Sequence, residues 1–192
     1  AISLLFALAR HIPKADAGMK AGEWPKAGLT GFEVEGKRLG VIGLGRIGST
    51  VAHKAVGVGM EVAAYDPFLP AAAASRQSLQ MKSLDELLAW ADIITLHIPR
   101  TKETTNIIGE AQMRLMRKGS YLINAARGGL VDEDALLKLL DEGHLAGLET
   151  FDALAARHDA AAGGKDTGHA NEIARGDARR PQIDPQRGND HR

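Results

Sequence analysis

The chain has 192 residues, with 24 Lys and Arg against 24 Asp and Glu, and it contains no Cys. This length suits one domain of the common size of ~100–200 residues, and the balanced charge excludes a global field that would attract nucleic acid or an acidic membrane surface. Without Cys, disulfides and thiolate metal sites are excluded and a reducing compartment is favoured, so we expect a cytoplasmic protein with a small-molecule partner and no metal.

The first predicted element is an apolar helix from Ile2 to Arg10. The apolar run is far shorter than the ~20 residues that a membrane span needs, and it lacks the basic leader of a signal peptide. We therefore predict a packed helix rather than a membrane anchor. Because the chain opens without Met, we expect that a further segment precedes it in the natural protein.

Between residues 38 and 151, apolar runs alternate with helical periodicity, which is typical of a parallel sheet covered on both faces. Ser83 and Glu86 predict a capping box at one helix start, and Asp132 precedes another helical stripe. Right-handed crossovers then favour an α/β, doubly wound, Rossmann-type fold in three layers, with five parallel strands in the order 3-2-1-4-5. The five predicted strands are Leu39–Ile42, Val62–Tyr65, Ile93–His97, Tyr121–Asn124 and Leu145–Leu148.

The last segment, residues 153–192, differs in kind. Its large apolar residues are only Leu154, Ile173 and Ile183, and none of its residues is aromatic. The burial of these few apolar side chains would not offset the entropy lost when the segment becomes ordered. We therefore predict a disordered tail. Its composition also resembles the product of a shifted reading frame in a GC-rich gene, a hypothesis that a comparison of the nucleotide sequence in all frames would test.

A glycine pattern, GLGRIG at residues 43–48, follows the first predicted strand and precedes a predicted helix over residues 49–58. In this context Gly43 allows the tight turn, Gly45 lets the backbone approach a pyrophosphate, and Gly48 allows close packing of helix on strand. The alternative is a strand-to-helix turn without a ligand, since one such match arises easily in a chain with 22 Gly. The predicted pyrophosphate-binding residues are Gly43, Gly45, Arg46, Ile47 and Gly48.

An acidic residue, Asp66, ends the second predicted strand 18 positions after Gly48, close to the ~20 expected for a ribose-binding acid. Its carboxylate can accept both ribose hydroxyls, whereas a 2'-phosphate would meet like charge. No Arg follows Asp66 directly to receive such a phosphate, so NAD is favoured over NADP. The alternative is a surface Asp that opens the turn before Pro67.

Three further stretches resemble one family, the D-2-hydroxyacid dehydrogenases. They are LFALAR at residues 5–10 continuing to MKAGEW at 19–24, HIPRTKET at 97–104, and NAARGGLVDEDAL at 124–136. The similarity extends from residue 1 to about residue 152. It implies an interdomain helix and turn over residues 1–30, an NAD-binding Rossmann domain over 31–152 and an atypical tail over 153–192.

The resemblance implies that Arg127 is catalytic and binds the carboxylate and carbonyl of a 2-hydroxy or 2-oxo acid such as 3-phosphoglycerate. Arg127 follows a predicted strand at the carboxyl edge of the sheet, and a guanidinium grips a carboxylate with two parallel bonds. The alternative is an ion pair with Asp132. The resemblance also implies cofactor-side positions, although a packed structural His97 is favoured over a catalytic one. These positions are His97, Pro99, Thr104, Ala125, Arg127 and Glu149.

The acid/base pair of the family, a His held by a Glu, is not identified in this sequence. The position of the Glu is Leu154, and His169 only faintly matches the position of the His. We therefore expect an oxidoreductase lineage, with a non-catalytic NAD-binding or interaction module as the alternative for this chain. The apolar surface of the first 24 residues resembles the dimer-forming segment of the family, so we expect a homodimer.

Overall fold

The computed structural model describes residues 1–24, 28–69 and 79–150, with the side chains of residues 149 and 150 excepted. All of the described residues belong to one compact unit of the chain. The predicted tail, residues 153–192, lies outside the described residues, as do Leu154 and His169.

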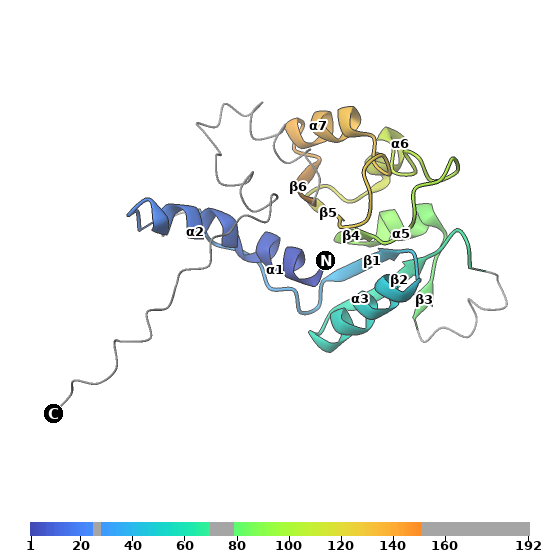
Figure 1. The fold of residues 1–192 in the computed structure, drawn as a ribbon, viewed down its shortest axis with the longest axis horizontal. Helices are drawn as coiled ribbons and strands as arrows, with labels where there is room; N and C mark the ends of the chain where they lie inside the picture. Colours follow the sequence, from blue (N-terminus) through green and yellow to red (C-terminus); the bar gives the residue numbers. More distant parts are fainter. Residues whose placement is uncertain (25–27, 70–78, 151–192) are drawn as a thin grey trace, which may run out of the picture. The chain divides into compact units, whose positions relative to one another are not determined.

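The described elements follow the predicted alternation of helices and strands (Figure 1). The helices are α1 (Ile2–Arg10), α2 (Ile12–Lys20), α3 (Arg46–Gly57), α5 (Leu84–Trp90), α6 (Glu110–Leu115) and α7 (Glu133–Asp141). The strands are β1 (Arg38–Ile42), β2 (Glu61–Tyr65), β3 (Gln80–Met81), β4 (Ile93–Leu96), β5 (Ser120–Asn124) and β6 (Leu145–Thr150).

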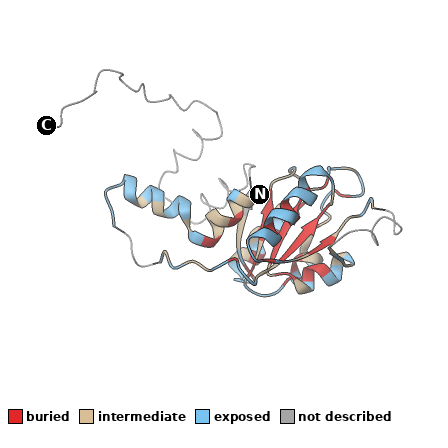
Figure 2. Cartoon of the chain, turned by 90° about the horizontal axis from the view of Figure 1, so that it is seen from below, coloured by how far each residue is buried: buried red, intermediate tan, exposed pale blue. Residues whose placement is uncertain are grey.

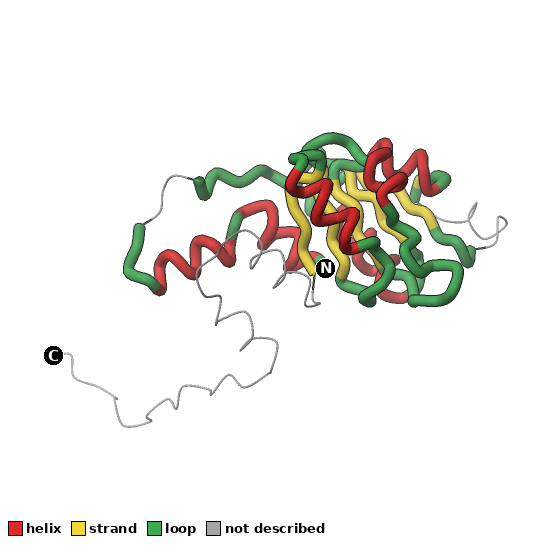
Figure 3. The backbone as a smooth tube through the Cα atoms, turned by 90° about the horizontal axis from the view of Figure 1, so that it is seen from above, coloured by secondary structure: helices red, strands yellow, loops and turns green. Residues whose placement is uncertain are grey.

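All six strands form one parallel sheet in the order β3-β2-β1-β4-β5-β6, and Figure 3 shows these strands side by side beneath the helices. The parallel pairing was predicted, but the order of the five predicted strands was wrong. The third of them, now β4, pairs with β1 and not with β2. The neighbour of β2 on its outer side is β3, whose two residues are too few to produce a periodicity that sequence analysis detects.

Successive residues of a strand point to opposite faces of a sheet. The side chains of this sheet therefore contribute to two hydrophobic cores, one on each face. Ile94 belongs to the core beneath α5, α6 and α7, whereas its neighbour Ile93 belongs to the core beneath α1 and α3. The central strands β1, β4 and β5 are the most buried elements, and the outer faces of the helices are exposed (Figure 2). The three layers predicted from the sequence are thus present in the described residues.

Two predicted helix starts are confirmed. The Ser83 hydroxyl accepts a bond from the Glu86 amide at 3.4 Å, and the Glu86 carboxylate accepts one from the Ser83 amide at 2.9 Å. The Asp132 carboxylate accepts a bond from the Ala135 amide at 3.1 Å. One start was placed too late: α3 begins at Arg46 rather than at residue 49, because Gly45 already serves as its N-cap.

The amino-terminal segment contains two helices rather than the predicted helix and turn. His11 lies between α1 and α2 with a φ of 52°, a left-handed conformation that turns the chain. Helix α1 buries Leu5 and Ala9, whereas α2 buries none of its side chains. In the described residues, no helix has the length and apolarity that a membrane crossing requires.

Candidate functional site

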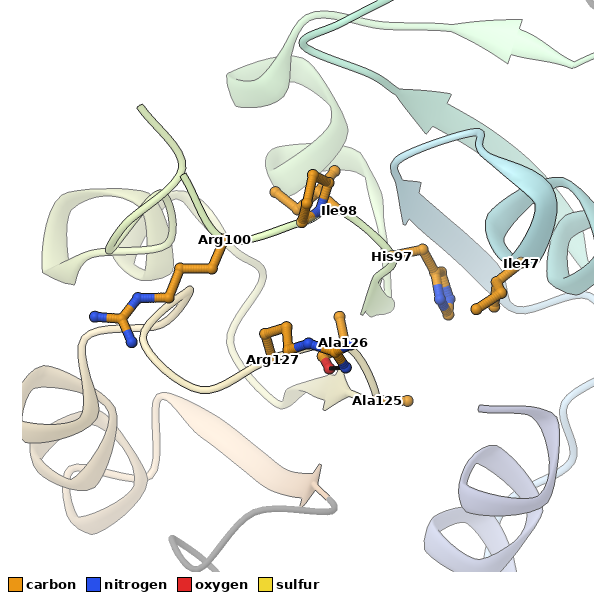
Figure 4. Close-up of a pocket in the computed structure, with 8 residues that line it drawn as sticks. Ile47, His97, Ile98, Arg100, Ala125, Ala126 and Arg127 are labelled. Atoms are coloured by element: carbon orange, nitrogen blue, oxygen red, sulfur yellow. Dashed lines mark hydrogen bonds between the residues drawn. The ribbon is translucent and has the colours of Figure 1, made fainter. Parts of the chain in front are cut away.

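The candidate site lies at the carboxyl ends of the central strands, the edge where parallel α/β sheets bind ligands. The loops after β1, β4 and β5 meet there around a pocket of about 380 Å³ (Figure 4). None of the described residues that line this pocket carries a carboxylate. Its lining residues are Ile47, His97, Ile98, Pro99, Arg100, Ala125, Ala126 and Arg127.

The glycine loop has the geometry that a dinucleotide pyrophosphate requires. Gly43 has a φ of 97°, and its amide donates to the Tyr65 carbonyl at 2.7 Å. A Cβ on Gly48 would collide with the Gly43 carbonyl oxygen, so helix and strand are packed closely there. A Cβ on Gly45 would meet nothing within 4 Å, which leaves open space beside the backbone.

The backbone amides in the first turn of α3 have no hydrogen-bond acceptor within the helix. Gly45 is the N-cap and supplies no side-chain bond, and no acidic residue lies in the first turn. Arg46, Ile47 and Gly48 form this turn. They were predicted to lie in the loop before the helix. Unpaired amides and the positive end of the helix dipole together favour an anion such as a pyrophosphate, so the loop fits the cofactor.

Asp66 lies directly beside the glycine loop, 22 positions from Leu44 in the sequence. One carboxylate oxygen accepts a bond from the Leu44 amide at 2.7 Å, and the other accepts one from the Phe68 amide at 2.8 Å. Each carboxylate oxygen has two lone pairs, so both retain acceptor capacity for ribose hydroxyls. The predicted acid and the predicted glycines are therefore brought together in space.

His97 follows β4 and packs against the glycine loop. Its amide donates to the Ile42 carbonyl at 2.7 Å, and its ring Nε2 lies 3.0 Å from the Thr95 hydroxyl. Its Cβ lies 3.2 Å from the position that a Cβ on Gly48 would take. Burial lowers the pKa of His97 to about 4, so the imidazole is neutral at physiological pH. The side chain also reaches the pocket wall.

The loop after β4 places its other predicted site residues differently. Pro99 lines the pocket. Thr104 is buried and does not, because its hydroxyl donates to the Pro99 carbonyl and accepts from the Thr101 amide, both at 2.7 Å. Thr104 thus shapes the loop that presents Pro99.

The loop after β5 carries Ala125, Ala126 and Arg127 into the pocket wall. Arg127 is exposed, and its Nη1 donates to the Ala126 carbonyl at 2.9 Å. Among the described residues it makes no ion pair, and Asp132, its predicted alternative partner, caps α7 instead. The guanidinium therefore remains available to a ligand.

Asn124 is a residue that the sequence analysis quoted within a motif but did not assign to the site. It ends β5 and is 9% exposed. Its amide nitrogen donates to the Arg127 carbonyl at 3.0 Å, and its amide oxygen accepts from the Ala126 amide at 3.2 Å. A polar residue that ends a buried strand was the available signal, and it holds the turn from which Arg127 projects.

The two pocket-forming loops are joined beyond the sheet. Ile108 and Val131 form an isolated parallel bridge, in which the Ile108 amide donates to the Leu130 carbonyl at 3.1 Å and the Asp132 amide to the Ile108 carbonyl at 3.0 Å. Glu149 lies on β6 with its backbone opposite Ile123, and its side chain lies outside the described residues.

Comparisons with known proteins agree with this geometry. The family model "D-isomer specific 2-hydroxyacid dehydrogenase, NAD binding domain" matches residues 2–159. The chain is 45% identical over 154 residues to D-3-phosphoglycerate dehydrogenase of Methanocaldococcus jannaschii, covering 79% of this chain and 29% of the relative. It is 43% identical over 152 residues to the Bacillus subtilis D-3-phosphoglycerate dehydrogenase, covering 78% and 29%. The chain thus spans less than a third of the length of these relatives.

Solved structures give the same result. A pyruvate reductase of Chlamydomonas reinhardtii matches with a TM-score of 0.72 and 40% identity, over 77% of this chain and 43% of that one. An NAD-dependent formate dehydrogenase from Staphylococcus aureus in complex with NAD matches with a TM-score of 0.70 and 33% identity, over 78% and 45%. The family model matches most of this chain, and the glycine loop lies beside Asp66 as an NAD site requires. This chain therefore belongs to the D-isomer specific 2-hydroxyacid dehydrogenase family and carries its NAD-binding domain.

Proposed function

We propose that this chain binds NAD with the pyrophosphate at the first turn of α3 and the adenosine ribose at Asp66, and that it presents Arg127 to the carboxylate of a small 2-hydroxy or 2-oxo acid. The observation that carries the proposal is the bond from Asp66 to the Leu44 amide, which unites ribose acid and glycine loop in one site. When bound at this loop, NAD would supply the hydride acceptor or donor. The pocket wall made by Ile47 and His97 adjoins this site and continues to Arg127.

In this proposal, the residues of the chain bind and orient rather than move protons. The Arg127 guanidinium holds the acid by its carboxylate and carbonyl oxygens. The neutral His97 and the apolar side chains of Ile47 and Ile98 adjoin the reacting end without adding charge. Lactate-like and phosphorylated acids both contain the group that Arg127 recognises, and two of the relatives reported above are D-3-phosphoglycerate dehydrogenases.

A second candidate is an NAD-binding or interaction module without catalysis. Leu154 at the position of the family Glu favours it for this polypeptide. A titration of the chain with NADH, followed by energy transfer from Trp24 and Trp90 to the nicotinamide, tests the binding step. Turnover of a 2-oxo acid with NADH then separates the two candidates. Absence of saturable energy transfer would exclude NAD binding and would leave only an interaction module.

Asp66→Ala is expected to weaken NAD binding by about tenfold or more, since a hydrogen bond to a charged group contributes ~1.5–3 kcal/mol. NADP binding is expected to fall less or to improve, because the charge that repels its 2'-phosphate is removed. Titration of both cofactors measures the ratio. Asp66→Asn is the control for the Leu44 bond, because it keeps an acceptor there without the charge. Equal losses for NAD and NADP would contradict the assignment of Asp66 to the ribose.

We also propose self-association through the amino-terminal helices, together with a cytoplasmic location that the Cys-free composition supports. Met19 and Trp24 are 52% and 72% exposed on and after α2. Met19→Glu is expected to shift light-scattering mass from dimer to monomer, because it places a charge in an apolar contact. Val56→Glu on α3, at a site 51% exposed, is the matched control and should leave the mass unchanged. A monomeric wild-type chain at high concentration would contradict the proposal.

A further inference from the structure

Arg100 lies on the loop after β4 and lines the same pocket as Arg127. The two arginines lie on loops that follow neighbouring parallel strands, since β4 pairs directly with β5. In Figure 4 the Arg100 side chain extends away from Arg127 rather than toward it, so the two arginine side chains lie apart.

The described lining of the pocket has a positive character. Arg100 and Arg127 are both exposed, and of the other described lining residues His97 alone is titratable and is neutral. Arg100 makes no hydrogen bond or ion pair with any described residue. By contrast, Arg114 and Arg117 each bind an acidic side chain at 3.1 Å or less. Two unpaired guanidiniums in one pocket favour a ligand with two negative groups.

The place of the Arg100 guanidinium depends on Gly129. Gly129 has a φ of 76°, and a Cβ there would lie 2.8 Å from both Cζ and Nε of Arg100. The Gly129 carbonyl accepts a bond from the Asn106 amide at 2.9 Å, which fixes this turn against the loop of Arg100. The guanidinium therefore packs against the backbone of Gly129, two residues beyond Arg127, in a place that a side chain at position 129 would occupy.

We infer that Arg100 is a specificity residue that binds a second anionic group, so that the acid held by Arg127 carries a further carboxylate or a phosphate. The inference rests on the proposed function, because Arg127 must hold the first carboxylate. A planar guanidinium suits either oxyanion with two parallel bonds. The separation of the two arginine side chains in Figure 4 suits a ligand whose anionic groups stand at opposite ends.

Calorimetric titration of the 192-residue chain saturated with NAD tests this inference. Oxidised cofactor carries no hydride to transfer, so 2-oxo acids bind without turnover. The ligands are pyruvate with one anionic group, 2-oxoglutarate with two carboxylates, and phosphohydroxypyruvate with a carboxylate and a phosphate. The wild-type chain is expected to bind one of the two doubly anionic acids about tenfold or more tightly than pyruvate, and the preferred one identifies the second group.

Arg100→Gln is expected to remove this preference while leaving the affinities for pyruvate and NAD within about twofold of wild type. Lys102→Gln, an exposed position on the same loop outside the pocket lining, is the matched control and should keep the preference. A wild-type chain that binds all three acids equally would overturn the role of Arg100 alone, as would a loss of NAD affinity in Arg100→Gln. If no 2-oxo acid binds, the substrate part of the proposed function fails as well.

Discussion

Gly48→Ala is expected to abolish measurable NAD binding and to lower the unfolding temperature by roughly 2–12 °C. The added Cβ would collide with the Gly43 carbonyl oxygen and press on His97, both of which are fixed by hydrogen bonds to the ends of central strands. Overpacking against such neighbours costs about 1–3 kcal/mol, and each kcal/mol lowers the melting temperature of a chain of this size by roughly 2–4 °C. Calorimetry and NADH titration measure the two effects.

Two other glycines of the same region provide controls. A Cβ at Gly45 or at Gly57 would meet nothing within 4 Å. Gly45→Ala is expected to keep the unfolding temperature but to weaken NADH binding, because its methyl group enters the space beside the first turn of α3. Gly57→Ala is expected to leave binding unchanged and to stabilise the helix by about 0.5–1 kcal/mol. A Gly48→Ala protein as stable as wild type would show that the close packing of α3 on β1 is wrong.

Arg127→Ala is expected to leave NADH affinity nearly unchanged while eliminating detectable binding of 2-oxo acids to the cofactor complex. Arg127 makes no ion pair with the described residues and bonds only the neighbouring carbonyl of Ala126, so the fold depends little on its side chain. A charged hydrogen bond contributes ~1.5–3 kcal/mol, and the arginine makes two in parallel. In a reconstructed full-length enzyme, turnover per bound cofactor should fall by orders of magnitude.

Arg127→Lys separates charge from geometry. A lysine keeps the positive charge but loses the planar fork, so it is expected to restore little of the affinity. Near-normal turnover and substrate affinity in Arg127→Ala would show that the arginine is structural. Because NADH affinity is measured in the same samples, a loss caused by unfolding is distinguished from a loss of the substrate contact.

The sequence was most informative where local pattern and fold agree. The capping residues Ser83 and Asp132 were identified because the chemistry of a helix start acts within a few residues. The strand order was predicted wrongly because β3 pairs through only Gln80 and Met81, and so short a strand depends on its neighbour rather than on its own side chains.

The sequence pattern alone did not predict the individual contacts between residues that are distant in the chain. The sequence predicted that Asp66 and the glycine loop would share a ligand, but not that Asp66 accepts a bond from the Leu44 amide. Nor does a motif indicate that Arg100 rests on Gly129, since that contact depends on how two loops fold over one another.

The bridge between Ile108 and Val131 has a consequence for motion. Loops at the edge of a sheet usually open independently, and their amides exchange with solvent at separate rates. Here the amides of Ile108 and Asp132 donate hydrogen bonds between the loops after β4 and β5. Neither loop can therefore open without breaking the bonds that the two loops share. The end of the pocket that contains Arg100 and Arg127 is thus one cooperative unit, in which slow exchange at Ile108 reports on order at Arg127.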